Sequence, residues 1–330
     1  MRYGLPYKGS KNGIAEWIVR TLPAADTFVD LFCGGGAVTH AAMLSGKWEH
    51  FIMNDIDARL PELFKDCAFG KHTIKNHPEW ISRQEFHERK ADDAYIALVW
   101  SFGNNGIDYL YGEDIEEFKH AYHKAVFNGE LEGLQPYGYK LTKSNKPDVY
   151  ERYLDYQRQI KIIIQDKPAD ITRLNNLERI QNIESLQRLQ SLQSLQSLQS
   201  LQSLQSLQSF GRDFAEVLIP KGALIYCDIP YNNSNCGKYK GFNHERFYEW
   251  ARQQDNIFIS EYHMPDDFIP FARIEKAVMS AVNTNAIKAT ETIFTNRQTY
   301  ESFDSATRDL IKTRFGNQVS IFDFISEEAP

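Results

Sequence analysis

Two short segments carry residues whose types and spacing could support chemistry. In the first, Asp30-Leu-Phe-Cys-Gly-Gly-Gly36, glycines follow an apolar run. Such glycines let the backbone turn tightly and bring a ligand against the next helix N-terminus. Asp55 ends the following apolar run, where a carboxylate can accept hydrogen bonds from ribose hydroxyls. The alternative is a tight strand-to-helix connection with a capping aspartate. A nicotinamide cofactor is disfavoured, because its fingerprint needs glycine at position 39, which is Thr39.

The second segment is Asp228-Ile229-Pro230-Tyr231, which leaves the apolar run 223–227 for a loop. It combines a carboxylate, a rigid proline turn and an aromatic ring at the carboxyl end of an expected strand. In a parallel sheet that end faces the ligand crevice. An ordinary strand exit with a capping Asp is the alternative for these residues alone.

The elements that must position these segments read as a strand–helix–strand pattern that stops and later resumes. Hydrophobic periodicity predicts helices over 13–22, 37–44 and 243–253. Apolar runs predict strands over 27–32, 50–55, 223–228, 256–260 and 291–295. This alternation predicts an α/β fold with a parallel sheet. The sheet pattern stops near residue 65 and resumes near 210, so the segment between reads as an inserted, mostly helical domain.

A low-complexity tract lies inside this insert. Residues 185–209 are nearly pure Ser-Leu-Gln triplets, and an apolar three-residue period already begins at Ile171. A period of three matches neither an α-helix nor a strand. Two interpretations stay open, namely a length-variable helix or small solenoid that packs its leucines, and a partly disordered linker.

The composition limits the class of protein. The chain has 330 residues, of which 42% are hydrophobic and 13% aromatic, enough for a sizeable core. No apolar run approaches the roughly 20 residues that span a bilayer, and the start lacks a signal-peptide core. The cysteines lie far apart without a C-x-x-C pair, which indicates neither a disulfide framework nor a zinc site. We expect a soluble, reduced, cytoplasmic protein with no membrane and no metal partner.

The charge distribution bears on nucleic acid as a partner. The net charge is -7, which by itself argues against a nucleic-acid binder. Residues 140–173, however, hold eight basic side chains against five acidic ones. This stretch follows Tyr137 and Tyr139, and it is either a DNA-binding surface or a solvated helix face. The candidate DNA-binding residues are Tyr137, Tyr139, Lys140, Lys143 and Lys146.

Taken together, the motifs resemble a known family, the Dam-like (D12 class) adenine-specific DNA N6-methyltransferases. Phe32-Cys-Gly-Gly-Gly36 resembles the family's F-x-G-G-G cofactor loop, and Asp228–Tyr231 resembles its D-P-P-Y catalytic tetrad. Tyr7-Lys-Gly-Ser-Lys11 is similar to its N-terminal aromatic-x-Gly-Gly-Lys segment. Asn54-Asp55-Ile56 resembles its ribose-binding acid, and Ser101–Ile107 loosely resembles the start of its recognition part. The resemblance covers roughly residues 3–65 and 210–300, in the family's chain order.

The resemblance implies a Rossmann-like S-adenosylmethionine-dependent methyltransferase sheet with helices on both faces. Residues 1–66 and 210–330 would form the catalytic domain, 67–184 the target-recognition region and 185–209 the repeat. The substrate would be double-stranded DNA, methylated at a specific sequence on N6 of an adenine flipped out of the duplex. A restriction–modification role, with a cognate restriction endonuclease as partner, is implied by the family but not visible in the sequence.

The resemblance also implies roles for individual residues. Asp228, Ile229, Pro230 and Tyr231 would be catalytic, with Tyr231 stacking on the base unless it is a buried core tyrosine. Tyr239 and Phe242 could wall the base pocket or pack in the core, and His244 starts the next helix. The expected cofactor-binding residues are Tyr7, Lys11, Asp30, Phe32, Gly34, Gly36, Asp55 and Asp228. Lys11 alone could equally be a solvated lysine at a helix start.

Ile229 departs from the family pattern, which has proline there. Isoleucine keeps the backbone carbonyl that would accept a hydrogen bond from the target amine, but the loop loses a fixed φ. Because Pro230 follows, Ile229 is still restricted to extended conformations. We therefore expect lowered rigidity with retained chemistry. The alternatives are a non-catalytic DNA- or protein-binding module with a decayed tetrad, and methylation of cytosine N4 or of RNA.

Overall fold

The computed structural model describes residues 3–72, 79–165, 183–201, 206–231, 241–280 and 283–316. The chain divides into two compact units. Unit 1 comprises Met1–Ser10 and Glu62–Ser203, and unit 2 comprises Lys11–Pro61 and Leu204–Pro330. The sheet and both candidate motifs lie in unit 2, whereas Tyr7 lies in unit 1.

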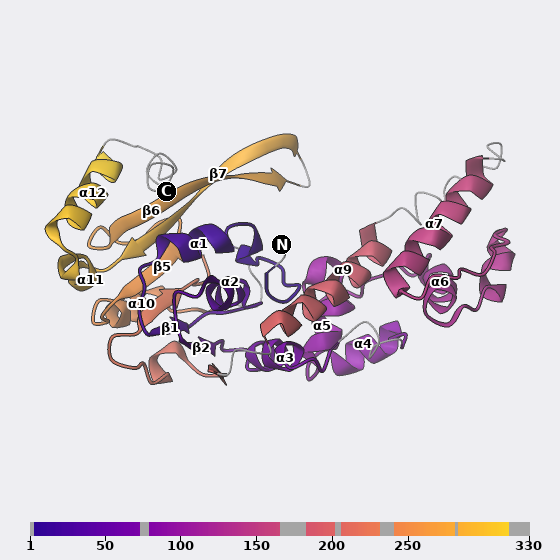
Figure 1. The fold of residues 1–330 in the computed structure, drawn as a ribbon, viewed down its shortest axis with the longest axis horizontal. Coiled ribbons are helices and arrows are strands. Elements are labelled where there is room, and N and C mark those ends of the chain that lie inside the picture. Colours follow the sequence, from indigo (N-terminus) through magenta and orange to yellow (C-terminus); the bar gives the residue numbers. More distant parts are fainter. Residues whose placement is uncertain are drawn as a thin grey trace. The chain divides into compact units, whose positions relative to one another are not determined.

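Unit 2 is built on a seven-stranded sheet in the order β3-β2-β1-β4-β5-β7-β6 (Figure 1). Strands β1 to β5 pair in parallel, and β7 runs antiparallel to both β5 and β6. The bounds are β1 Thr27–Asp30, β2 His50–Asn54, β3 Leu207–Phe210, β4 Leu224–Cys227, β5 Ile257–Glu261, β6 Ile269–Ser280 and β7 Asn283–Thr295. The expected Rossmann-like α/β fold with helices on both faces of the sheet is confirmed.

The central strands are buried on both faces, which explains their continuous apolar sequences. One face packs Val29, Ile225 and Ile259 against Phe247 of α10. The other face carries Phe28, whose ring lies 4.9 Å from that of Trp48. The helices of unit 2 are α1 Ala15–Thr21, α2 Ala37–Ser45, α10 His244–Ala251, α11 Arg297–Ser302 and α12 Ser305–Gly316. Of these, α2 connects β1 to β2 and α10 connects β4 to β5, which gives two of the crossover connections that a parallel sheet requires.

The strand order reverses between β1 and β4. From β1 the chain proceeds through β2 to β3 on one side, whereas β4 and β5 continue on the other. In open α/β sheets the ligand crevice lies at such a switch point, outside the carboxyl ends of the strands. Asp30 pairs with Tyr226 in the register of β1 and β4, and Leu31 N donates to Tyr226 O at 3.1 Å. The glycine loop and the segment from Asp228 therefore leave the sheet side by side.

Strands β3 and β6 are absent from the sequence prediction. β3 contains the last Ser-Leu-Gln residues, so part of the repeat belongs to the sheet. β6 is longer than the runs that apolar pattern alone selects, and it pairs with β7 in an antiparallel hairpin with two irregularities in register. β7 itself begins eight residues before the predicted strand 291–295.

Unit 1 is helical in the part that the structure describes. Its aromatic core joins Phe118, Tyr122, Leu134, Tyr139 and Tyr156. The helices are α4 Arg83–Arg89, α5 Ala94–Val99, α6 Glu116–Asn128, α7 Val149–Gln165 and α9 Ile183–Ser197, with most of α3 Arg59–Ala68. The short 3-10 turns of unit 1 are Phe102–Asn104, Glu132–Tyr137 and Leu198–Leu201, and those of unit 2 are Lys11–Gly13 and Phe214–Glu216.

The Ser-Leu-Gln repeat forms an α-helix over part of its length, which agrees with the first of the two interpretations that the sequence left open, a helix that packs its leucines. α9 runs through the repeat and ends in the 3-10 turn Leu198–Leu201. Leu192, Leu195 and Leu198 are fully buried, and Ser191 and Ser194 are buried beside them. Because serine is small, it can share the packed side with leucine while the leucine stripe winds round the helix axis.

The N-terminal part of α9 holds the segment Ser101–Ile107 of unit 1. Gln187 accepts from Gly103 N at 3.1 Å and donates to Ser101 O at 2.8 Å. Asn104 donates to Ser191 Oγ at 3.0 Å. These contacts fix the loop backbone while the Phe102 side chain stays 53% exposed. None of the helices that the structure describes is both long and apolar enough to cross a membrane.

Candidate active site

Four polar side chains meet at the carboxyl edge of the sheet. Lys11 Nζ lies 2.8 Å from Asp228 Oδ1 and 3.2 Å from Glu291 Oε1. It also donates a short hydrogen bond to the Tyr231 hydroxyl, which donates to Glu291 Oε1 at 2.7 Å. Three distant parts of the chain thus meet in one cluster, which we call the Lys11 cluster (Lys11, Asp228, Tyr231 and Glu291).

Burial makes the charges of the Lys11 cluster strongly interdependent. The side chains of Lys11 and Glu291 are 6% and 0% exposed, and that of Asp228 is 21% exposed. Burial alone lowers the pKa of Lys11, but Asp228 and Glu291 outweigh it and raise that pKa, so the ammonium stays charged. Burial, together with Asp228 and Glu291, raises the pKa of Tyr231. Its hydroxyl therefore stays protonated and acts as a hydrogen-bond donor.

Glu291 has a further donor from the neighbouring strand, because Ser260 Oγ lies 3.0 Å from its Oε1. Nothing in the sequence around Glu291 distinguishes it from other acids. The signal that was available is a charged residue at the start of the strand predicted over 291–295. A buried charge on a strand needs a partner, and that partner is Lys11.

Glu261, at the end of β5, is a second acid that the sequence analysis did not single out. Its side chain is 2% exposed, and its Oε1 accepts from Tyr262 N at 2.7 Å. Burial is the main cause that raises the pKa of Glu261 to about 7, and Asp228 adds to it. Glu261 is therefore electrostatically coupled to the cluster.

The glycine loop is fixed by Asp55 from the next strand. Gly34 N donates to Asp55 Oδ2 at 2.9 Å, and Asp57 N donates to Asp55 Oδ1 at 2.9 Å. Gly34 and Gly36 have φ of 48° and 67°, values that glycine adopts without strain. Gly36 also precedes α2 as its N-cap, so the loop turns directly into a helix N-terminus.

Asp30 lies beneath this loop and is 1% exposed. Its Oδ2 accepts from Thr39 Oγ1 at 2.7 Å, whereas its buried Oδ1 has no hydrogen-bond partner within the described chain. Burial raises the pKa of Asp30 to about 7, and the charges of Asp228 and Asp55 contribute to the shift. Asp30, Asp55 and Asp228 therefore lie close enough for their charges to interact.

The loop after β4 is anchored by the core and by His244. The Ile229 side chain is 2% exposed and belongs to the apolar cluster under the sheet. His244 Nε2 lies 2.8 Å from Pro230 O and can donate to it, while Asn243 caps the helix that His244 begins. The helix start at His244 is as expected, but its contact with the tetrad was not foreseen.

A family model for D12 class N6 adenine-specific DNA methyltransferases matches residues 7–300. The chain belongs to this family. A search of curated proteins gives no match. The protein is therefore an adenine-specific DNA methyltransferase that uses S-adenosylmethionine, as the sequence motifs predicted.

The residues at the switch point fit this methyltransferase cofactor. S-adenosylmethionine is a cation at its sulfonium and amino groups, and Asp30, Asp55 and Asp228 give this edge negative charge. The unpartnered Asp30 Oδ1 is a buried acceptor that a cationic donor would satisfy. The Phe32 ring lies 5.6 Å from that of Phe242, giving an aromatic wall beside the glycine loop.

The predicted DNA-binding residues of the methyltransferase divide by exposure. Lys140, Lys143 and Lys146 are exposed, and Tyr137 is half-buried against Phe118. Tyr139, in contrast, is fully buried in the aromatic core of unit 1 and is not accessible to DNA. The alternation of that segment turns Tyr139 inward, which its composition does not reveal. Tyr239 and the basic residues Lys167 and Arg173 lie outside the described residues.

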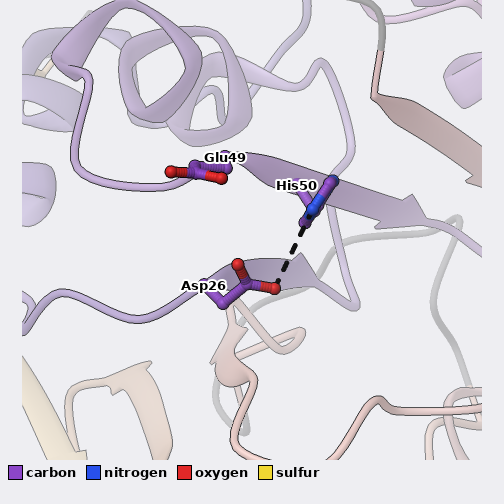
Figure 2. Close-up of side chains that lie close together, drawn as sticks. All are labelled: Asp26, Glu49 and His50. Carbon is purple, nitrogen blue, oxygen red and sulfur yellow. Dashed lines mark ion pairs between the residues drawn. The ribbon is translucent and has the colours of Figure 1, made fainter.

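Among the described residues, one group of His, Cys, Asp or Glu side chains has its possible metal-ligand atoms within 4.8 Å of one another, namely Asp26, Glu49 and His50 (Figure 2). All are exposed, and His50 Nε2 lies 4.0 Å from Asp26 Oδ2. They lie at the starts of β1 and β2, the edge opposite the Lys11 cluster. Glu49 N and His50 N both donate to Asp26 O at 3.1 Å, so backbone pairing accounts for their proximity.

Proposed function

We propose that this methyltransferase acts at a specific DNA sequence on an adenine that is flipped out of the duplex and held at the Lys11 cluster. The supporting observation is that the glycine loop and Asp228 leave adjacent strands β1 and β4 at the switch point of the sheet. Cofactor and target amine can then meet at one edge. An adenine inside a duplex could not reach this edge, because its N6 is stacked and paired.

We assign Asp228 and the Ile229 carbonyl as acceptors for the two N–H groups of adenine N6. The lone pair of N6 is delocalised into the ring, which makes the amine a poor nucleophile. Two acceptors favour a tetrahedral nitrogen whose lone pair faces the methyl donor. The bound cofactor supplies an electrophilic methyl group on its sulfonium. Ile229 retains the carbonyl, and its buried side chain anchors the loop that proline would stiffen.

Lys11 and Glu291 would set the state of Asp228. A lysine between two carboxylates leaves the cluster with net negative charge, so Asp228 keeps acceptor capacity for the amine. Glu291 also fixes the Tyr231 hydroxyl, which orients the ring that we assign to stacking on the flipped base. Lys11 thus positions Asp228, in addition to its predicted contact with the cofactor.

We assign target recognition to unit 1, with Lys140, Lys143 and Lys146 as phosphate contacts and Tyr137 beside them. Their exposure makes them available to DNA. The Ser101–Ile107 loop, which α9 holds and which presents Phe102, is the candidate for contact with bases. Tyr7 remains a predicted cofactor contact.

The test is Asp228→Ala, measured by transfer of labelled methyl groups from S-adenosylmethionine to DNA. We expect a loss of at least about 10²-fold in single-turnover rate at saturating cofactor, where weaker cofactor binding caused by loss of the Asp228 charge does not enter the comparison. Asp213→Ala is the control, since Asp213 is an aspartate of the same unit that pairs with Arg246 at the surface. Full transfer by Asp228→Ala would refute the assignment.

Mass spectrometry of the product nucleosides tests the acceptor atom. N6-methyladenine is expected, whereas N4-methylcytosine or modified RNA would contradict the proposal. Mapping of methylated adenines in host DNA should return one short shared sequence. Modification without any shared sequence would refute site specificity.

A further inference from the structure

A groove of about 450 Å³ in unit 2 includes Tyr262, whose ring packs on Tyr231 of the Lys11 cluster. It is lined by Tyr262, His263, Arg273, Thr290 and Thr292, and we call it the β5–β7 groove. Tyr262 and His263 follow the end of β5, and the threonines lie on β7. None of these residues is among the motifs that the sequence analysis identified. The size is that of a site for a small organic group such as a nucleotide.

Tyr262 connects the β5–β7 groove to the tetrad. Its ring centroid lies 4.5 Å from that of Tyr231, at an interplanar angle of 39°. The Tyr262 side chain is 37% exposed, so one part of its ring packs on Tyr231 and another part faces solvent. A group bound in the groove would therefore lie one aromatic ring away from the residue assigned to the flipped base.

The lining of the groove is suited to an anion combined with an aromatic base. Arg273 is exposed, and its Nε donates to Thr292 Oγ1 at 3.4 Å. Its guanidinium also lies 5.4 Å from the Phe315 ring centre. Within the described chain, no carboxylate forms an ion pair with Arg273. Its remaining N–H groups are held in place and available to a phosphate, which guanidinium groups bind well.

The hairpin of β6 and β7 extends this surface beyond β5. β7 pairs with β5 only through residues 292–295, whereas its pairing with β6 continues to Asn283 (Figure 1). The two-stranded part therefore projects past the end of β5, at the carboxyl edge of the sheet. Arg273 pairs with Thr292 at the base of this projection, where the groove lies.

We propose that the β5–β7 groove binds the target DNA strand beside the flipped adenine, with Arg273 and the threonine hydroxyls on a phosphate and Tyr262 on the neighbouring base. This inference rests on the proposed function and adds a DNA contact on the catalytic unit. The DNA strand continues on both sides of a flipped base. In this proposal, one of the two flanking DNA segments passes the ring of Tyr231. Glu275 is on the same strand two residues further, but it does not line the groove.

The experiment measures binding of the full chain to a fluorescein-labelled DNA duplex at several salt concentrations. Arg273→Gln should weaken binding about tenfold and reduce the slope of log affinity against log salt by about 0.9, the value for one phosphate contact. Arg20→Gln is the matched control, because Arg20 is an exposed arginine of the same unit that precedes β1 at the opposite edge. It should leave affinity and slope unchanged.

Tyr262→Leu tests the stacking role. It should weaken binding to single-stranded DNA by roughly fivefold or more without changing the salt slope. Affinity for S-adenosylhomocysteine, measured by calorimetry, should stay at the wild-type value in both groove variants, which also reports that the catalytic unit is folded.

An Arg273→Gln variant with the wild-type slope would overturn the proposal, as would an equal effect of Arg20→Gln. Failure of the proposed function gives a different result, namely full methyl transfer by Asp228→Ala or methylated adenines without a shared sequence. Wild-type transfer with unaltered Arg273→Gln binding rejects the groove alone.

Discussion

Replacing Glu291 by glutamine removes one charge from the Lys11 cluster while keeping the shape of the side chain. Glu291 is fully buried and accepts from Tyr231 at 2.7 Å, from Ser260 at 3.0 Å and from Lys11 at 3.2 Å. Loss of one partner of a buried ion pair costs about 3–5 kcal/mol when the other charge is left unpaired. Lys11 keeps Asp228 at 2.8 Å, so we expect the lower value for a charged hydrogen bond, about 2 kcal/mol.

The same substitution should slow methyl transfer. Without Glu291, Asp228 alone balances the ammonium charge of Lys11. The closer pairing with Lys11 makes the Asp228 carboxylate a weaker hydrogen-bond acceptor for adenine N6. If about 1.4 to 2.8 kcal/mol of transition-state stabilisation is lost, the rate falls about 10- to 100-fold. Because Glu291 pairs with Lys11, which is an expected cofactor-binding residue, cofactor affinity should also fall, but by less than the rate.

The assay combines single-turnover methyl transfer, calorimetric cofactor binding and denaturant unfolding. Ser260→Ala is the matched control, since it removes a neutral hydrogen bond to Glu291 and leaves every charge in place. It should cost about 1 kcal/mol of unfolding free energy and keep most of the rate. If Glu291→Gln matches the wild type in both rate and stability, the Lys11 cluster does not act as we describe.

The remaining predictions concern pH, the repeat and its packing. Burial raises the folded-state pKa of Asp30 to about 7, above its unfolded value, so its contribution to stability decreases as pH rises from about 4 to 7. Binding of the cationic cofactor favours ionised Asp30, so the cofactor affinity measured by calorimetry should increase as pH rises through about 7. Thr39→Val should move the midpoint of this increase to higher pH, because the hydrogen bond from Thr39 lowers the pKa of Asp30. An affinity independent of pH from 5.5 to about 8.5 would contradict this assignment. Leu195→Ala in α9 should lower the unfolding free energy by about 2–5 kcal/mol, because that side chain is fully buried, whereas the exposed Gln193→Ala should change it by less than about 0.5 kcal/mol. Equal effects of the two repeat variants in denaturant unfolding would show that the leucines do not pack.

The sequence predicted those elements whose signal is local. Buried parallel strands need continuous apolar runs, so β1, β2, β4 and β5 could be found from the sequence within one or two residues of their ends. β3 was not predicted from the sequence, because it is formed from the repeat and its pairing partner β2 lies far away in the chain. β6 was not predicted for a similar reason, since it mixes apolar and polar residues without a clear period and pairs with β7.

The candidate site follows the same division. Glycines at positive φ and an aspartate at a strand end have local signatures, so Gly34, Gly36 and Asp228 could be selected from types and spacing. Tyr139 was misjudged because its burial depends on helices α6 and α7 packing around it. Glu291 was missed because its partner Lys11 lies at the other end of the chain.

The sequence by itself determined the α/β class, the family and the order of the cofactor and catalytic segments, because each depends on neighbouring residues. Only the tertiary structure decided that Lys11 lies between Asp228 and Glu291, that the Ser-Leu-Gln repeat contributes both a helix and a strand, and that Tyr262 packs on Tyr231 beside a groove. These facts depend on contacts between residues far apart in the chain. Charge pairing and strand pairing over such separations leave no local pattern to read.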